Sequence, residues 1–113
     1  MHKLSLVDTR QALLDKKMSS EELTRHYLNR INTHKDWNAY ITVCEDMAIA
    51  QAKESDKKIR EGSQGELEGI PLGIKDLFLT KGVLTTAGSK MLSNFIPPYE
   101  STVSKKLLDA GGV

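Results

Sequence analysis

The chain has 113 residues, enough for one modest domain with a limited hydrophobic core. Sixteen Lys and Arg residues oppose fifteen Asp and Glu residues, and without a run of basic residues the composition does not indicate a nucleic-acid-binding surface. The single cysteine, Cys44, excludes an internal disulfide, and no segment is typical of a signal peptide or a membrane span, so we expect a cytoplasmic protein without membrane contact.

Residues 1–36 are predicted to form a pair of helices. Apolar residues recur at helical spacing between Leu4 and Leu14, and Ser5 is suited to cap this first helix. Ser19 and Glu22 have the spacing of a capping box. They predict the start of a second helix, whose apolar stripe extends from Leu23 to Ile31.

Residues 37–113 are predicted to alternate between strands and helices, which indicates an α/β fold. Residues Ala39–Cys44 alternate in character and are rich in β-branched and aromatic side chains, so they are predicted to form a strand. One helix is predicted over residues 45–60, and a last helix is predicted to be capped by Ser101 and stopped by Gly111. Because so few strands cannot make a sheet covered on both faces, we expect this chain to be the front part of a larger protein.

The residues Gly69–Asp76, called the lysine segment below, place a lysine inside an apolar run punctuated by glycines. If the segment is a strand, successive side chains point to opposite faces. One face then carries Ile70, Leu72 and Ile74, and the other carries Pro71, Gly73 and Lys75. Asp76 then points away from Lys75, while Gly73 leaves open space beside it. We expect the first face to pack on a core and Lys75 to be partly desolvated, which would favour a neutral amine able to accept a proton. The alternative is a surface lysine whose stem lies along apolar neighbours.

A loop of small and polar residues follows the lysine segment and is suited to line a site. The residues concerned are Thr85, Thr86, Gly88 and Ser89. Ser89 is also predicted to cap a short helix through Leu92. The sequence has no phosphate loop, dinucleotide fingerprint, Cys/His metal cluster or G-x-S-x-G elbow. Of a serine–lysine catalytic arrangement it offers only the lysine.

The lysine segment, together with Gly82, Thr85–Thr86 and Gly88–Ser89, resembles the lysine region of the amidase signature family. Further motifs extend the resemblance over essentially the whole chain, namely Ser19–Leu23, Trp37–Tyr40 and Tyr99–Val103. They are most similar to the family branch found in the tRNA-dependent amidotransferases that act on glutamyl-tRNA(Gln) and aspartyl-tRNA(Asn). The resemblance implies a mixed-sheet α/β/α core that begins with residues 37–113. It is incomplete here, because the signature that carries the catalytic serines would lie beyond Val113.

The resemblance also implies a Ser–cis-Ser–Lys triad in which Lys75 is the lysine. In that mechanism the neutral lysine takes a proton, through the bridging cis-serine, from a nucleophilic serine that attacks the side-chain amide of glutamine. Thr85, Thr86, Gly88 and Ser89 would support the substrate pocket. The released ammonia would pass to a partner in a complex with B and C subunits, where ATP and Mg²⁺ are used to amidate misacylated tRNA. No cofactor is expected on this chain itself.

Without the serines, we expect the chain alone to lack amidase activity. Two other interpretations remain open at this point. One is part of an amidase for small amides from the same family. The other is a non-catalytic helical module that binds a partner through its first two helices, in which case a core of their own should be formed by Leu6, Leu13, Leu23 and Tyr27.

Overall fold

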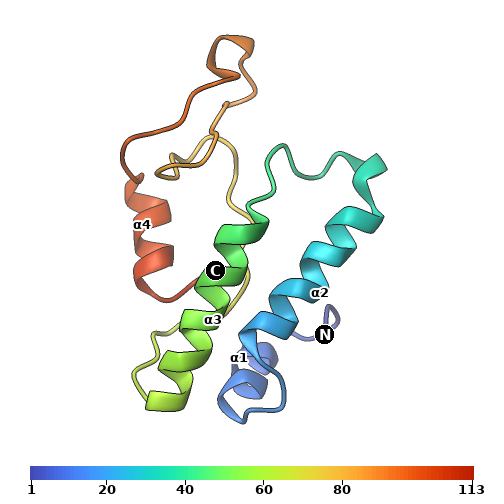
Figure 1. The fold of residues 1–113 in the computed structure, drawn as a ribbon, viewed down its shortest axis with the longest axis vertical. Helices are drawn as coiled ribbons and strands as arrows, with labels where there is room; N and C mark the ends of the chain where they lie inside the picture. Colours follow the sequence, from blue (N-terminus) through green and yellow to red (C-terminus); the bar gives the residue numbers. More distant parts are fainter.

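The computed structural model describes all residues from Met1 to Val113 and is helical (Figure 1). Its α-helices are α1 (Leu6–Leu14), α2 (Ser20–Thr33), α3 (Glu45–Glu61) and α4 (Thr102–Asp109), and its short 3-10 helices are η1 (Lys35–Trp37) and η2 (Lys90–Leu92). The helices predicted from the sequence are therefore confirmed. None of them combines the length and the apolar character that spanning a membrane requires.

The helix starts follow the predicted capping pattern. Ser5, Ser19 and Ser101 each accept a hydrogen bond from the main-chain N–H three residues further on. Glu22 completes the capping box, because its carboxylate accepts the Ser19 N–H at 2.8 Å. Ser89 precedes η2 but its side chain makes no capping hydrogen bond, so that part of the prediction is wrong.

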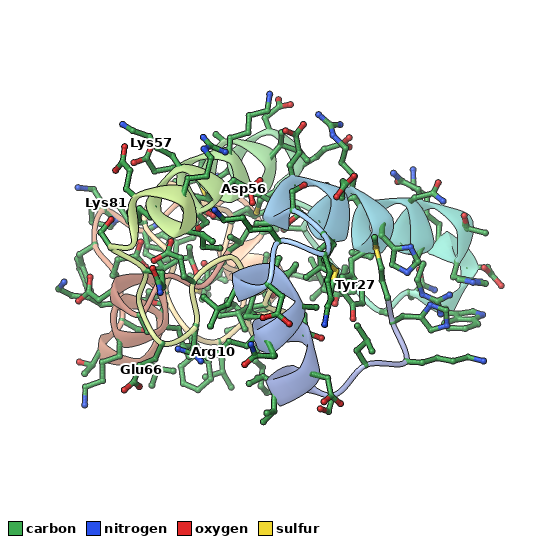
Figure 2. All side chains as sticks on the ribbon, turned by 90° about the horizontal axis from the view of Figure 1, so that it is seen from below. Arg10, Tyr27, Asp56, Lys57, Glu66 and Lys81 are labelled. Carbon is green, nitrogen blue, oxygen red and sulfur yellow. The ribbon has the colours of Figure 1, made fainter.

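Helices α2 and α3 pack side by side (Figure 1). A side chain of α3 also caps α2. The Asp56 carboxylate on α3 accepts the main-chain N–H of Ser20 at 2.7 Å and that of Glu21 at 3.1 Å. In Figure 2, Asp56 lies where α3 faces the start of α2. A carboxylate at this place satisfies two free N–H groups and complements the positive end of the helix dipole.

The hydrophobic core joins the first two helices to the lysine segment. Leu13, Leu23 and Ile70 are buried together, and other side chains pack partly buried against them, namely Met18, Tyr27, Ile59 and Leu72. The apolar face predicted for the lysine segment is therefore confirmed at Ile70 and Leu72. Leu6 remains 52% exposed, so the helix pair has no separate core of the kind that the binding-module interpretation requires.

Helix α4 ends in a Schellman motif, which confirms the predicted glycine stop. Gly111 has a φ of +92°. Its N–H donates to the Leu108 carbonyl at 2.9 Å, and the Gly112 N–H donates to the Leu107 carbonyl at 3.0 Å. The motif turns the chain back toward the lysine segment, where the Gly69 N–H donates to the Gly111 carbonyl at 2.9 Å.

The predicted strand Ala39–Cys44 is wrong, because these residues form an irregular connection between η1 and α3. Ile41 and Val43 are exposed. High β propensity reflects packing against neighbouring strands, and no strand lies beside this stretch. The lysine segment, also predicted as a strand, forms no strand in residues 1–113, so the mixed sheet of the predicted α/β core is not formed within them.

The cap from Asp56 gives the first testable prediction. Asp56→Ala leaves the N–H groups of Ser20 and Glu21 without their acceptor, and we expect it to lower the free energy of unfolding by about 1–2 kcal/mol. Glu54→Ala, at an exposed position of the same helix, should change it by less than about 0.5 kcal/mol. Urea unfolding followed by circular dichroism measures both, and equal effects would contradict the assigned cap.

Candidate active-site segment

The lysine segment starts from a glycine fixed against the N-terminus of α2. The Ser20 hydroxyl is fully buried and donates to the Gly69 carbonyl at 2.9 Å. Gly69 has a φ of +75°, and a Cβ there would lie 2.9 Å from both Cβ and Oγ of Ser20. Both the backbone conformation and the close approach therefore require glycine at this position.

A buried carboxylate, Glu68, holds the turn immediately before Gly69. It accepts hydrogen bonds from the Ser55 hydroxyl at 2.7 Å and the Gly65 N–H at 2.9 Å, and the Lys58 ammonium lies 3.7 Å away. These partners compensate the cost of removing a charge from water. Neither periodicity nor capping spacing marks a buried carboxylate in a turn, so Glu68 was not predicted from the sequence.

Helix α1 also contacts this turn. The Arg10 guanidinium donates through Nε to the Glu66 carbonyl at 2.9 Å, and Figure 2 shows Arg10 on α1 directed toward the loop that carries Glu66. Helices α1, α2 and α3 thus each contribute a polar contact to residues 65–69. The start of the lysine segment is set by all three of them.

Lys75 lies at the exposed end of the lysine segment. Its carbonyl accepts the Phe78 N–H at 3.0 Å, but its ammonium makes no ion pair and no hydrogen bond to a hydroxyl of this chain. Within residues 1–113 Lys75 is therefore exposed, as the alternative of a surface lysine predicts. No ion pair joins Lys75 to Asp76.

Tyr40 is the side chain that approaches the lysine segment at Gly73. A Cβ on Gly73 would lie 3.2 Å from the Tyr40 hydroxyl oxygen and 3.6 Å from its ring, so the phenol lies against Gly73. The space expected to be open beside Lys75 is therefore partly filled. Tyr40 is still 48% exposed, and its place in an irregular connection gave no sequence signal for this contact.

The loop of small and polar residues is brought to the lysine segment through Asp76. The Asp76 carboxylate accepts hydrogen bonds from the Thr86 hydroxyl and from the Thr86 N–H, the latter at 2.9 Å. Its carbonyl accepts the Ala87 N–H at 2.8 Å. Within the loop, the Gly88 N–H donates to the Thr86 hydroxyl and the Ser89 N–H to the Thr86 carbonyl.

These hydrogen bonds determine the titration of Asp76. The Thr86 hydroxyl, and then the Thr86 N–H, hold the pKa of the Asp76 carboxyl below its ordinary value, with partial desolvation opposing them. Asp76 is thus a structural carboxylate that ties the loop to the residue next to Lys75. Thr85 and Thr86 are buried, whereas Gly88 is exposed and Ser89 is half-buried. The arrangement offers an amine at the edge of a polar loop but no activated nucleophile.

Comparison with known proteins identifies the class of protein that carries this segment. The family model described as "Amidase" matches residues 22–113. The chain belongs to the amidase family.

Particular relatives are similar over the whole chain. The chain is 46% identical over 113 residues to the A subunit of glutamyl-tRNA(Gln) amidotransferase from Azorhizobium caulinodans, and 48% identical over 114 residues to the protein of the same name from Pseudomonas aeruginosa. Both alignments include 100% of this chain, but only 23% of the Azorhizobium caulinodans protein and 24% of the Pseudomonas aeruginosa protein. The chain thus spans about a quarter of the length of these relatives, and it corresponds to an N-terminal portion of them.

The fold is also found in a solved structure. An amidase family protein from Bacillus anthracis str. Ames superposes with a TM-score of 0.82 and 32% sequence identity, over 94% of this chain and 22% of the other. Although residues 1–113 are mainly helical, they therefore have the fold of one part of a longer amidase family protein.

The contact between Gly69 and Ser20 gives a prediction with a matched control. Gly82 has nearly the same φ, +76°, but a Cβ there would meet nothing within 4 Å. Gly82→Ala should therefore lower the free energy of unfolding by about 1–2 kcal/mol, because alanine disfavours the left-handed conformation. Gly69→Ala should lower it by about 1–3 kcal/mol more, because the new methyl group would also overpack against Ser20. Denaturant unfolding measures the difference, and equal costs would contradict the close approach.

The hydrogen bonds to Asp76 predict a specific pH dependence. Because the folded-state pKa is lowered from 3.8, the stabilisation is fully present above that ordinary value and is lost as the pH falls through the lower folded-state pKa. Thr86→Val removes the hydroxyl donor and should raise the pKa of Asp76, whereas Thr102→Val on the exposed face of α4 should leave it unchanged. A carboxyl titration followed by NMR tests this, and an unmoved pKa in Thr86→Val would exclude the assigned cause.

Proposed function

We propose that this chain provides the lysine-bearing part of a glutamine-hydrolysing amidase, the A subunit of a tRNA-dependent amidotransferase. The observation that carries the proposal is the similarity over the whole chain to relatives of that name, at 46% and 48% identity. Lys75 is the residue that we assign to catalysis. It stands at the exposed end of a segment whose start is rigidly anchored and whose far end is tied to the 85–89 loop.

The proposed chemistry is acyl transfer from the side-chain amide of glutamine. Lys75, as a neutral amine, accepts a proton through a bridging serine from a nucleophilic serine, which attacks the amide carbon. Ammonia leaves, and water then hydrolyses the acyl-enzyme. Thr85, Thr86, Gly88 and Ser89 support the pocket in this proposal, with Asp76 holding their loop in place.

Both serines would come from the part of the family polypeptide that this chain does not cover. Residues of a catalytic unit lose most of their effect when one is missing, so residues 1–113 should be inactive by themselves. Burial of Lys75 would also depend on that part, because Lys75 is exposed in residues 1–113. The proposed assembly includes B and C subunits in the cytoplasm. ATP and Mg²⁺ are used by one of these partners, and tRNA is reached only through the complex.

An amidase for small amides is the second candidate within the family. The similarity to a solved amidase family protein, with a TM-score of 0.82, is compatible with it. Lys75 would have the same role in both cases. Comparing hydrolysis of glutamine with that of a small aliphatic amide, by the same reconstituted protein, separates the two candidates.

The role of Lys75 predicts the outcome of a reconstitution. The chain is mixed with the separately produced remainder of the Pseudomonas aeruginosa relative, and ammonia release from glutamine is measured. We expect activity only in the mixture, and we expect Lys75→Ala to reduce it by about 10³-fold or more. Lys81→Ala, which removes an exposed lysine from the neighbouring turn, serves as the matched control and should retain full activity.

Two results would count against this proposal. Activity that survives Lys75→Ala removes Lys75 from the mechanism. Ammonia release by residues 1–113 alone would show that the serines of the proposed triad are not needed.

A further inference from the structure

Two histidine rings meet where the N-terminal residues pass α2. The Nδ1 atom of His2 lies 3.3 Å from the Nε2 atom of His26, although the two residues are 24 positions apart in the sequence. The rings are nearly parallel, with an interplanar angle of 6° and centroids 5.4 Å apart. Because the two nitrogens are closer together than the ring centres, they occupy the facing edges of the rings. Figure 1 shows the N-terminus beside α2.

Local packing holds both rings in place. The Leu4 N–H donates to the Met1 carbonyl at 3.0 Å, which turns the N-terminal segment, and the Leu4 side chain lines an apolar cavity together with Tyr27 of α2. The Tyr27 ring contacts the His26 ring edge to face, with centroids 5.6 Å apart. His26 is half-buried and His2 is exposed, so a small ion can reach the pair from solvent in residues 1–113.

The separation of the two nitrogens fits a shared metal ion better than a direct hydrogen bond. N–H groups make hydrogen bonds of about 2.7–3.2 Å to oxygen, so a direct bond at 3.3 Å between the rings is a long one. Zinc binds imidazole nitrogen at about 2.0–2.1 Å in tetrahedral geometry, which places two such nitrogens about 3.3–3.4 Å apart. Neutral imidazole is also the commonest metal ligand among protein side chains.

We propose that His2 and His26 together bind one zinc ion, through Nδ1 of His2 and Nε2 of His26. The residues form no group of three or more Cys, His, Asp and Glu side chains that could hold a metal, so water completes the coordination. A site with two protein ligands is open, and it binds its ion more weakly than a closed structural site with four. The ion links the N-terminal segment to α2.

A neighbouring cation acts on the same place. The Arg30 guanidinium is the largest of the causes that hold the pKa of His2 below its ordinary value. A positive charge that disfavours a proton on His2 also disfavours a zinc ion there. Arg30→Gln should therefore tighten zinc binding by a few-fold, and more at low ionic strength than at high.

The inference goes beyond the proposed amidase role and does not depend on it. His2 and His26 lie outside the lysine segment and outside the 85–89 loop, and neither residue has a part in the proposed proton transfer. Because an ion that binds only the folded chain adds to its stability, zinc should also raise the midpoint of thermal unfolding.

The test is a titration of the chain, carrying no affinity tag, with zinc alone, followed by ¹⁵N NMR of the imidazole rings. Cys44→Ser is the background of every sample, because the single thiol is also a zinc ligand. We expect zinc to shift the resonances of His2 Nδ1 and His26 Nε2, with the proton of each ring on its other nitrogen. A direct hydrogen bond requires instead a proton on one of the two facing nitrogens.

Substitutions of single histidines provide the matched comparison. His2→Gln and His26→Gln should each weaken zinc binding by about 100-fold or more, because the second ligand no longer acts at a high effective concentration. His34→Gln removes a histidine that stacks on Trp37, with centroids 4.2 Å apart, and should leave the affinity unchanged. Isothermal titration calorimetry measures the affinities, and circular dichroism checks that each variant keeps its helices.

Three results would overturn the proposed site. Ring nitrogens that do not respond to millimolar zinc would leave the pair as a hydrogen bond only. Zinc binding that survives His26→Gln would assign the ion to His2 and nearby main-chain groups. An equal loss of affinity in His34→Gln would show unspecific binding at the surface. None of these results bears on Lys75, so failure of the zinc site and failure of the proposed function are separate findings.

Discussion

The junction between α3, the end of α4 and the lysine segment depends on one buried carboxylate. Glu68 accepts hydrogen bonds from Ser55 on α3 and from Gly65 in its own turn, and a Cβ on Gly111 would lie only 2.5 Å from its Oε2. A charge can be buried only where such donors compensate its lost hydration. The geometry that satisfies Glu68 therefore also fixes where α3, the end of α4 and the start of the lysine segment meet.

From this junction the lysine segment runs from buried, hydrogen-bonded residues to exposed residues with few contacts. Gly69 and Ile70 are buried and hydrogen-bonded, whereas Gly73 is exposed and Ile74 has unsatisfied main-chain groups. Lys75 follows at the open end. The anchored start of the segment fixes where its exposed end lies. Such an anchor would position Lys75 precisely if other parts of a longer amidase supply the rest of the site.

Local features of the sequence predicted local structure well. The caps at Ser5, Ser19 and Ser101, the capping box, the apolar stripe of α2 and the glycine stop of α4 each depend on residues within a few positions of one another, and each was confirmed, whereas the cap predicted at Ser89 was wrong. The strand Ala39–Cys44 failed because strand formation needs a neighbour that local pattern cannot supply. The contacts of Glu68, Asp56 and Tyr40 join residues distant in sequence, so no spacing rule could identify them. The role proposed for Lys75 was inferred from the motif around it.

The role assigned to Lys75 is tested most directly by a crystal structure of residues 1–113 in complex with the remainder of the Pseudomonas aeruginosa relative. We predict that the Lys75 ammonium lies within hydrogen-bond distance, about 3 Å, of a serine hydroxyl contributed by the remainder. Asp76 should still accept from Thr86 in that complex. A Lys75 side chain that remains in solvent, with no serine near it in the assembled protein, would contradict its assignment to catalysis.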